Sequence, residues 1–198
     1  MNEERLESLP PDYFDAVYAA NPDPWGFETS DYERDKYAAT LAALPRARYR
    51  NAFEIGCSIG VLTEKLAARC DTLLSIDVSR QALEKARERC RRFPWVRFAL
   101  MRVPREFPRE LFDLVLLSEV GYYLSLPDLA RAREEIIARL EPGGHLLLVH
   151  WTPHVPDYPL TGDEVHDLFV AGDGDGDGLR RLGGRRVDHY RLDLFERV

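Results

Sequence analysis

The sequence predicts an α/β fold in which helices cover both faces of a doubly wound, mostly parallel sheet. From residue 51 onward, short apolar runs alternate with segments of helical periodicity, as in chains that form parallel sheets. The runs DLVLLS at 113–118 and LLLV at 146–149 have no polar face, which is typical of strands buried on both sides. A glycine-bearing turn, FEIGCSIG at 53–60, joins the first run to the first helical segment, where such folds bind ligands.

The N-terminal region predicts a helical lid over 1–46, ahead of a core over 47–198. Helices are expected at Asp12–Ala20 and Tyr32–Leu44, and the prolines and glycine of NPDPWGFETS exclude a helix between them. Trp25 therefore lies on a turn, where either the core or a ligand must cover it.

The core elements follow in order. We expect strands at NAFEIG, TLLSIDV, VRFALM, FDLVLLSEV and HLLLVHW, and helices at GVLTEKLAARC, SRQALEKARERC and LPDLARAREEIIARL. Gly143 and Gly144 indicate a helix stop and a turn into the fifth strand. AGDGDGDGLRRLGGRR at 171–186 predicts a mobile loop, and the tail at 187–198 predicts a strand nearer the sheet edge.

The composition bounds the class of protein. The chain has 198 residues, of which 45% are hydrophobic and 31% charged, and this suits one globular domain over 1–198. It has no run of about 18 apolar residues, and its first ten residues are polar and acidic, so we expect a cytoplasmic protein without a membrane partner. The net charge of −7 disfavours nucleic acid and favours a small-molecule substrate. Three cysteines without a CxxC pair predict neither disulfides nor a zinc site, and the sequence specifies no oligomeric state.

The glycine turn carries the main chemical signal. Gly56 and Gly60 permit positive φ or close approach of a ligand, and the following helix offers free N–H groups. Their spacing is GxxxG, unlike the GxGxxG of nicotinamide-binding turns. Glu54 would repel a pyrophosphate and attract positive charge, such as the amino acid portion of S-adenosylmethionine.

A second carboxylate supports this interpretation. Asp77 ends the second strand, 23 positions after Glu54, where an acid would accept hydrogen bonds from both ribose hydroxyls. The alternative is a tight strand-to-helix turn followed by a helix-capping aspartate.

Several motifs in order resemble a known family. ExGCSxG, LLSIDVS, FDLVLLSEVGYYL and EPGGHLLLVHW resemble class I S-adenosylmethionine-dependent methyltransferases over about residues 51–151. YFDAVYAANPDPWGFETSDYERDKYAATLAALP and EIGCSIGVLTEKLA resemble, more narrowly, the nodulation-methyltransferase (NodS-like) group. The resemblance implies a Rossmann-like sheet of seven strands, complete or truncated, with S-adenosyl-L-methionine as cofactor.

The resemblance also implies roles for individual residues. Asp77 would bind the ribose, Val78 would pack on adenine, and Ser118 would lie on the cofactor side of its strand end. Where the family has an aspartate for the adenine amino group, this chain has Met101, Arg102 and Val103. Since a guanidinium cannot accept a hydrogen bond from an amine, we expect the Arg102 backbone and packing by its neighbours to substitute. The residues expected to line the methionine part are Glu54, Gly56, Cys57, Ser58 and Gly60.

The N-terminal helices are expected to close over the cofactor. Trp25 would form a wall, Tyr32 would offer a hydrogen bond, and the Lys36 ammonium would face the methionine carboxylate. The alternative is that both aromatic residues are helical core and that Lys36 is solvated.

Methyl transfer is an in-line displacement, so the protein must mainly align the reactants and exclude water, and Cys57 need not be a nucleophile. His150 is the first choice for a general base or acceptor-orienting group, with a loop-capping histidine as the alternative. Glu119 would either position the cofactor or be a solvated strand end, and Tyr122 is the third catalytic candidate. The residues expected on the acceptor side are Trp151, Tyr158 and Asp163.

Metal binding is not expected. His154 and His166 suggest a cluster with His150, but Pro153 and Pro156 exclude a helical HxxxH face. DGDGDG resembles the start of a calcium loop, yet the twelfth position is a glycine.

Two function classes stay open. The first is an enzyme that methylates nitrogen or oxygen of a small polar metabolite, either a sugar amine or a natural-product intermediate. The second is a non-catalytic sensor or accessory protein that binds S-adenosylmethionine or S-adenosylhomocysteine. A dinucleotide-dependent oxidoreductase is disfavoured by the GxxxG spacing.

Overall fold

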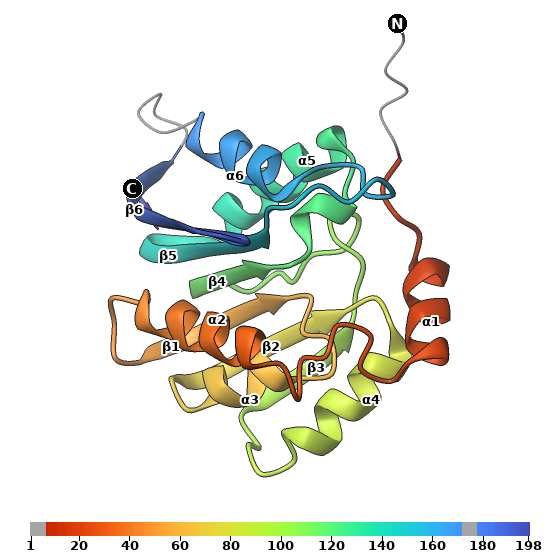
Figure 1. Ribbon diagram of the computed structural model, residues 1–198. Coiled ribbons are helices and arrows are strands. Elements are labelled where there is room, and N and C mark those ends of the chain that lie inside the picture. Colours follow the sequence, from red (N-terminus) through yellow and green to blue (C-terminus); the bar gives the residue numbers. More distant parts are fainter. Residues whose placement is uncertain (1–6, 172–177) are drawn as a thin grey trace, which may run out of the picture. The chain divides into compact units, whose positions relative to one another are not determined.

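The computed structural model describes residues 7–171 and 178–198. These residues form two compact units, one over 10–102 and one that combines 7–9 with 103–198 (Figure 1). They hold seven strands, so the prediction of a seven-stranded, mostly parallel α/β chain is confirmed. Asp173, Asp175 and Asp177 of the calcium-like run lie outside the described residues.

The unit over 10–102 carries three parallel strands in the order β3-β2-β1. Ile55 pairs with Ile76 and Asp77 with Leu100, so β1, β2 and β3 end close to one level. The helices and strands of this unit are α1 (Pro11–Ala20), α2 (Asp31–Ala42), β1 (Tyr49–Ile55), α3 (Val61–Ala67), β2 (Cys70–Asp77), α4 (Arg80–Arg89) and β3 (Val96–Leu100).

The N-terminal helices begin and end close to the predicted residues. Pro11 lies in the first turn of α1, where its missing N–H costs nothing. The Ser30 side chain accepts a hydrogen bond from the Glu33 N–H at the start of α2. Figure 1 shows α1 beside α4, and Trp25 packs against a buried cluster that includes Tyr18. The core of this unit therefore contacts the indole.

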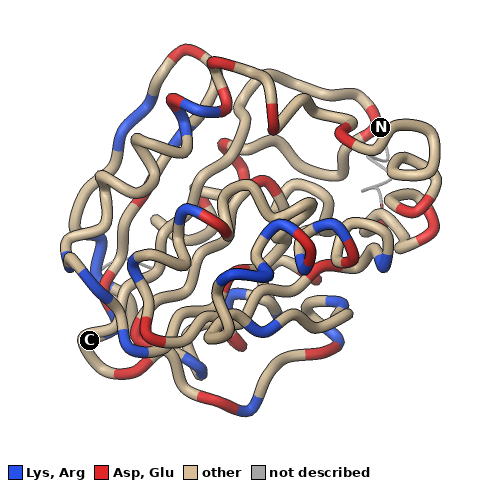
Figure 2. The backbone as a smooth tube through the Cα atoms, turned by 90° about the horizontal axis from the view of Figure 1, so that it is seen from below, with Lys and Arg blue, Asp and Glu red and all other residues tan. Residues whose placement is uncertain are grey.

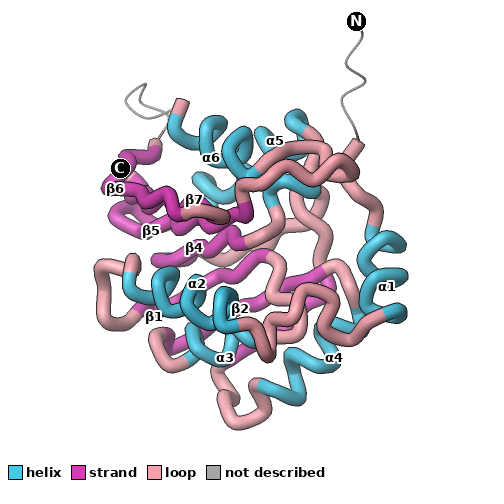
Figure 3. Tube along the Cα trace, viewed as in Figure 1, coloured by secondary structure: helices cyan, strands magenta, loops and turns pink. Residues whose placement is uncertain are grey.

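The other unit carries four strands in the order β4-β5-β7-β6 (Figure 3). β4 and β5 are parallel, whereas β7 runs antiparallel to both β5 and β6. Its elements are β4 (Phe112–Ser118), the short 3-10 helix η1 (Gly121–Tyr123), α5 (Leu126–Arg139), β5 (Leu140–Trp151), α6 (Gly162–Val170), β6 (Leu179–Val187) and β7 (Tyr190–Arg197).

The C-terminal strands correct one expectation. The predicted loop at 171–186 contains most of β6, which takes the edge position, and β7 lies next to it. Arginines occupy exposed β6 positions because acids on neighbouring elements pair with them, as Arg180 does with Glu196 and Arg186 with Asp163. Local periodicity could not predict this strand, because the ion pairs join residues that lie far apart in the sequence.

A second correction concerns the start of the fifth strand. β5 begins at Leu140, directly after α5, and runs through the expected turn at Gly143 and Gly144. Gly143 has a φ of 72°, and the β4–β5 register shifts between Phe112 and Leu114. The irregularity is thus absorbed inside the strand pair.

Acidic and basic residues are mixed along the trace (Figure 2). Several pairs lie one helical turn apart, including Arg34 with Asp31 and Arg91 with Glu88. No helix of the described residues is both long and apolar enough to cross a membrane.

Candidate functional site

The turn after β1 is held in a conformation that ordinary residues rarely adopt. Gly56, Ser58 and Gly60 have φ values of 80°, 50° and 81°. The Gly56 N–H donates to the Ile76 carbonyl at 2.9 Å, which ties the turn to β2. A Cβ on Gly60 would lie 2.9 Å from the Ala86 Cα, so glycine is required where the turn meets α4.

Asp77 clamps this turn from the end of β2. Its Oδ2 accepts the Ser58 N–H at 2.8 Å and its Oδ1 accepts the Ser79 N–H at 2.9 Å. Burial raises the pKa of Asp77, although the backbone N–H groups act in the opposite direction. The Val78 N–H also stabilises this carboxylate, and a carboxylate has about four lone-pair sites, so capacity is left to accept from a ligand hydroxyl. Val78, the next residue, is half-buried.

Glu54 is a buried carboxylate beside the turn. Its Oε2 accepts hydrogen bonds from the Thr63 hydroxyl at 2.6 Å and the Ser75 hydroxyl at 2.7 Å, and the residue is 2% exposed. Burial raises the pKa of Glu54 to about 7, since it outweighs the two hydroxyls and is reinforced by Asp77. Because ionising a buried carboxyl group costs free energy, a ligand with positive charge is suited to bind beside it and stabilise the ionised form.

Tyr18 is a residue that sequence reasoning missed. Its phenol oxygen lies 2.5 Å from the Ser58 Oγ, so α1 contacts the centre of the glycine turn. Burial raises the pKa of Tyr18, and the phenol stays neutral. Asp15, one turn earlier on α1, accepts from the Ser79 hydroxyl at 2.9 Å. The i, i+3 spacing of these two side chains was the available signal.

The other predicted residues of this unit lie in defined surroundings. Cys57 is buried, and burial raises the pKa of its thiol well above the usual value, which argues against a thiolate. The Met101 N–H donates to the Asp77 carbonyl at 3.1 Å, and the side chains of Met101 and Arg102 are half-buried. Val103, which belongs to the other unit, is buried.

Lys36 is paired within its own helix. Its ammonium lies 2.9 Å from the Glu33 Oε1 and 5.2 Å from the centre of the Tyr32 ring, and Lys36 is 2% exposed. It is therefore not a solvated lysine, and a contact with the methionine carboxylate stays a prediction.

Glu119 organises the polar group after β4 in the other unit. It has a φ of 57°, and its Oε2 accepts the Tyr122 hydroxyl at 2.6 Å and the Trp151 N–H at 2.9 Å. Left-handed backbone at a non-glycine residue is a strain that proteins keep mainly at functional sites. Ser118, just before it, is buried at the end of β4.

Three tyrosines pack around this carboxylate. Tyr158 stacks on Tyr122 with centroids 5.2 Å apart and meets Tyr123 edge-on at 4.8 Å. Burial and the charge of Glu119 raise the pKa of Tyr122, so its hydroxyl remains a donor. Trp151 is half-buried and stacks on His189 at 5.3 Å.

The geometry bears on the predicted roles of His150 and Asp163. His150 is fully buried, its Nε2 accepts the Gly121 N–H at 3.1 Å, and its Nδ1 lies 3.1 Å from the His166 Nε2. Because both ring nitrogens are hydrogen-bonded inside the protein, His150 is not placed to act as a general base. Asp163 is held by both terminal nitrogens of Arg186, which lowers its pKa, and its contact with the acceptor stays a prediction.

The described residues contain no group of three or more histidine, cysteine, aspartate or glutamate side chains arranged to hold a metal ion. His166 bonds directly to His150, while His154 is exposed on the loop after β5.

The strand order and the glycine turn define the α/β fold of methyltransferases. The N-methyltransferase NodS of Bradyrhizobium japonicum WM9, solved with S-adenosyl-L-homocysteine, matches 94% of this chain and 98% of its own, with a TM-score of 0.82 and 26% identity. A candidate methyltransferase from Pseudomonas syringae is 41% identical, with a TM-score of 0.73 over 84% of this chain and 99% of its own.

The chain belongs to the nodulation protein S (NodS) family, whose model matches residues 16–151. Nodulation protein S of Rhizobium tropici is 35% identical over 130 residues, and that of Sinorhizobium fredii is 33% identical over 132 residues. These regions are 65% of this chain in both cases, and only 55% and 60% of the two relatives. The resemblance to the nodulation-methyltransferase group is thereby confirmed.

Proposed function

We propose that the chain is an S-adenosylmethionine-dependent methyltransferase that acts on an amine nitrogen of a small polar metabolite. The observation that carries this proposal is the turn from Gly56 to Gly60, clamped by Asp77 beside the buried acid Glu54. The family relative solved with S-adenosyl-L-homocysteine supports the same cofactor class.

The residues present fit this cofactor. The spare lone pairs of Asp77 suit two vicinal ribose hydroxyls, and Glu54 supplies negative charge for the cationic amino acid end. Gly56 and Gly60 have no side chains, which leaves the backbone of the turn open to close approach by a ligand. Bound S-adenosylmethionine would supply a methyl group on a sulfonium, whose sulfur leaves as a neutral thioether without needing a proton. We propose that α1 and α2 help to exclude water from this region.

The group around Glu119 favours an amine acceptor. Stacked tyrosine faces and a carboxylate are the surroundings that bind ammonium groups. An amine that arrives protonated must lose a proton before it becomes a nucleophile. Since His150 has both nitrogens engaged, we assign this role to Glu119, with Tyr122 orienting its carboxylate through the 2.6 Å hydrogen bond. Tyr158 and Trp151 are proposed to contact the rest of the acceptor.

Calorimetry with S-adenosylmethionine, S-adenosylhomocysteine and a nicotinamide dinucleotide tests the cofactor. We expect binding of the first two compounds and none of the third. Transfer of a labelled methyl group to a panel of amino sugars, other amines and matched alcohols then tests the reaction. Binding without transfer to any acceptor would favour the sensor function, and absence of binding would refute the proposal.

Glu119→Gln supplies the residue-level test. Its amide keeps an oxygen for the Tyr122 hydroxyl and removes the proton acceptor, so we expect a large loss of kcat with cofactor affinity retained. Glu164→Gln is the matched control, because Glu164 caps α6 through Thr161 and contacts none of the acceptor-side residues. Equal kinetics in the two variants would remove Glu119 as the base.

A further inference from the structure

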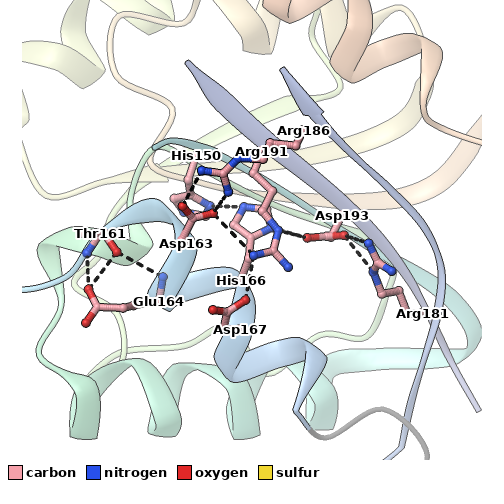
Figure 4. A network of polar contacts seen from close by, with 10 residues as sticks. All are labelled: His150, Thr161, Asp163, Glu164, His166, Asp167, Arg181, Arg186, Arg191 and Asp193. Carbon is pink, nitrogen blue, oxygen red and sulfur yellow. Dashed lines mark hydrogen bonds and ion pairs between the residues drawn. The ribbon is translucent and has the colours of Figure 1, made fainter. Parts of the chain in front are cut away.

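A line of buried hydrogen bonds runs from the turn η1 to β7, and Figure 4 shows its part from His150 through His166 to Asp193. The Gly121 N–H contacts the His150 Nε2 at 3.1 Å, the His150 Nδ1 contacts the His166 Nε2 at 3.1 Å, and the His166 Nδ1 contacts the Asp193 Oδ2 at 2.7 Å. Both imidazoles and the carboxylate are 0% exposed. We call these four residues the relay.

The chemistry of the two ends permits only one arrangement of protons. A backbone N–H can only donate, so the His150 Nε2 must be the bare, accepting nitrogen. A neutral His150 then carries its proton on Nδ1 and donates to His166, whose Nε2 must accept. The remaining His166 proton lies on Nδ1 and faces the carboxylate of Asp193, which can only accept. Every hydrogen bond of the relay is satisfied by this one set of tautomers.

Asp193 is fixed as the acceptor at its end. Arg181 donates to its Oδ1 through Nε at 2.8 Å and through a terminal nitrogen at 2.5 Å, and Arg191 donates to its Oδ2 at 2.8 Å. Burial would raise the pKa of Asp193, but the hydrogen bonds from His166 and Arg181 outweigh it and the pKa is lowered. Burial also lowers the pKa of His166 and outweighs the opposing effect of Asp193, which keeps the imidazole neutral.

The other end holds the turn that carries the acceptor-side residues. Gly121 begins η1, and the next residue, Tyr122, donates to Glu119. A Cβ on Gly121 would lie 2.5 Å from the Val165 Cγ1 and 3.0 Å from the His150 Nε2, so the turn packs directly against α6 and His150. The Gly121 hydrogen bond and the packing of α6 hold the start of the turn, while the Leu9 and Leu160 N–H groups bond to the carbonyls that follow.

We propose that His166 and Asp193 are positioning residues, which fix His150 in its Nδ1–H tautomer and so hold the turn with Tyr122 and Glu119. Their relevance to catalysis rests on the proposed function. The relay itself is testable without cofactor or acceptor, so its failure and the failure of the proposed function are distinguishable.

Proton–nitrogen NMR of the wild-type histidine rings is the direct measurement. At neutral pH we expect His150 and His166 each to show a protonated Nδ1 and a bare Nε2. Single variants His150→Gln and His166→Gln assign the two ring systems. An Nε2–H tautomer at either ring, or a doubly protonated ring, would overturn the proposal.

The second measurement tests whether Asp193 controls the distant turn. In Asp193→Asn the amide oxygen keeps both Arg181 hydrogen bonds only on the Oδ1 side, which leaves the NH2 facing His166. The tautomers must then invert, which places an Nε2–H of His150 against the Gly121 N–H. We expect exchange of the Gly121 amide with solvent to accelerate roughly five- to 150-fold, the range of typical couplings between sites.

Asp167→Asn is the matched control. Asp167 accepts from Arg191 at 2.7 Å in the same ion-pair network, but it is outside the relay. Exchange is compared with denaturant adjusted to give all proteins equal global stability, so that a general loss of folding does not mimic the effect. Gly121 exchange that is equal in the two variants would overturn the proposal. If Asp193→Asn does not fold, the wild-type tautomers decide.

Discussion

Glu54→Gln tests whether the buried acid is kept for a ligand at a cost to the folded protein. Glu54 is 2% exposed, and burial raises its pKa from about 4.5 to about 7. At about 1.4 kcal/mol per pKa unit, this rise means that ionising Glu54 costs the folded state roughly 3 kcal/mol relative to the unfolded chain.

The sign of the effect follows from proton linkage. A carboxyl group with a raised folded pKa contributes most stability below its unfolded pKa of about 4.5, and loses it as the pH rises through about 7. Glutamine cannot ionise, and its carbonyl oxygen can accept from Thr63 and Ser75 as the Glu54 Oε2 does. We therefore expect the variant to gain stability over the wild type with rising pH, by up to roughly 3 kcal/mol near pH 8.

Glu54→Gln should weaken cofactor binding, although it raises the stability of the protein. If the cationic cofactor binds only the ionised form of Glu54, wild-type affinity should rise roughly tenfold from about pH 6 to about pH 8, because the ionised fraction rises by that factor around a pKa near 7. Glu54→Gln should bind more weakly and lose this pH dependence.

Urea unfolding and calorimetry across this pH range measure both effects. Glu64→Gln is the control, because Glu64 lies on α3 next to Thr63, a hydrogen-bond partner of Glu54, but pairs with Arg92 near the surface. A Glu54→Gln protein that is destabilised equally at every pH would refute the reasoning, since the hydroxyl hydrogen bonds would then outweigh the burial of charge.

Three further predictions follow from the same geometry. Asp77→Ala should weaken cofactor affinity by about 1 to 3 kcal/mol, measured by calorimetry, because the Ser58 N–H and the ribose hydroxyls both lose their acceptor. Unchanged affinity would remove the ribose assignment. Gly60→Ala should destabilise the protein by at least about 1 kcal/mol in urea unfolding, because the φ of residue 60 is 81° and the added Cβ would clash with Ala86. Gly183→Ala is the control and should change stability little, because nothing lies within 4 Å of a Cβ at that position. Equal losses in the two variants would contradict the strain argument. Wild-type stability should also fall as the pH drops below about 6.5, because burial lowers the folded pKa of His166 and the unfolded chain binds the proton first. His166→Gln should reduce that acid-side slope, and an unchanged slope would assign it to other groups.

Much of the unit over 10–102 was predictable from local sequence. Alternating apolar runs mark buried strands, and glycine at 56 and 60 marks positive φ, because both properties depend on a residue and its near neighbours. Asp77 was equally readable, since it ends the strand that faces the turn. The tyrosine at 18 was harder to assign, because its partner Ser58 lies 40 positions away.

The residues from 140 onward show where local reasoning stops. His150 looked like a base because it follows an apolar run at a strand end, a position typical of catalytic groups. Its partners come from η1, α6 and β7, and only the folded chain brings them within hydrogen-bond distance of a buried ring. The arginines of β6 looked like a loop for the same reason, because the acids that pair with them lie on other elements.

The sequence by itself determined the fold class, the family and the turn that we assign to the cofactor, because these depend on periodicity and on backbone conformations that few residues allow. Tertiary structure alone decided which titratable groups have their nitrogens or oxygens already occupied. Whether a histidine can act as a base depends on what surrounds both of its nitrogens, and those neighbours are set by packing between elements far apart in the chain.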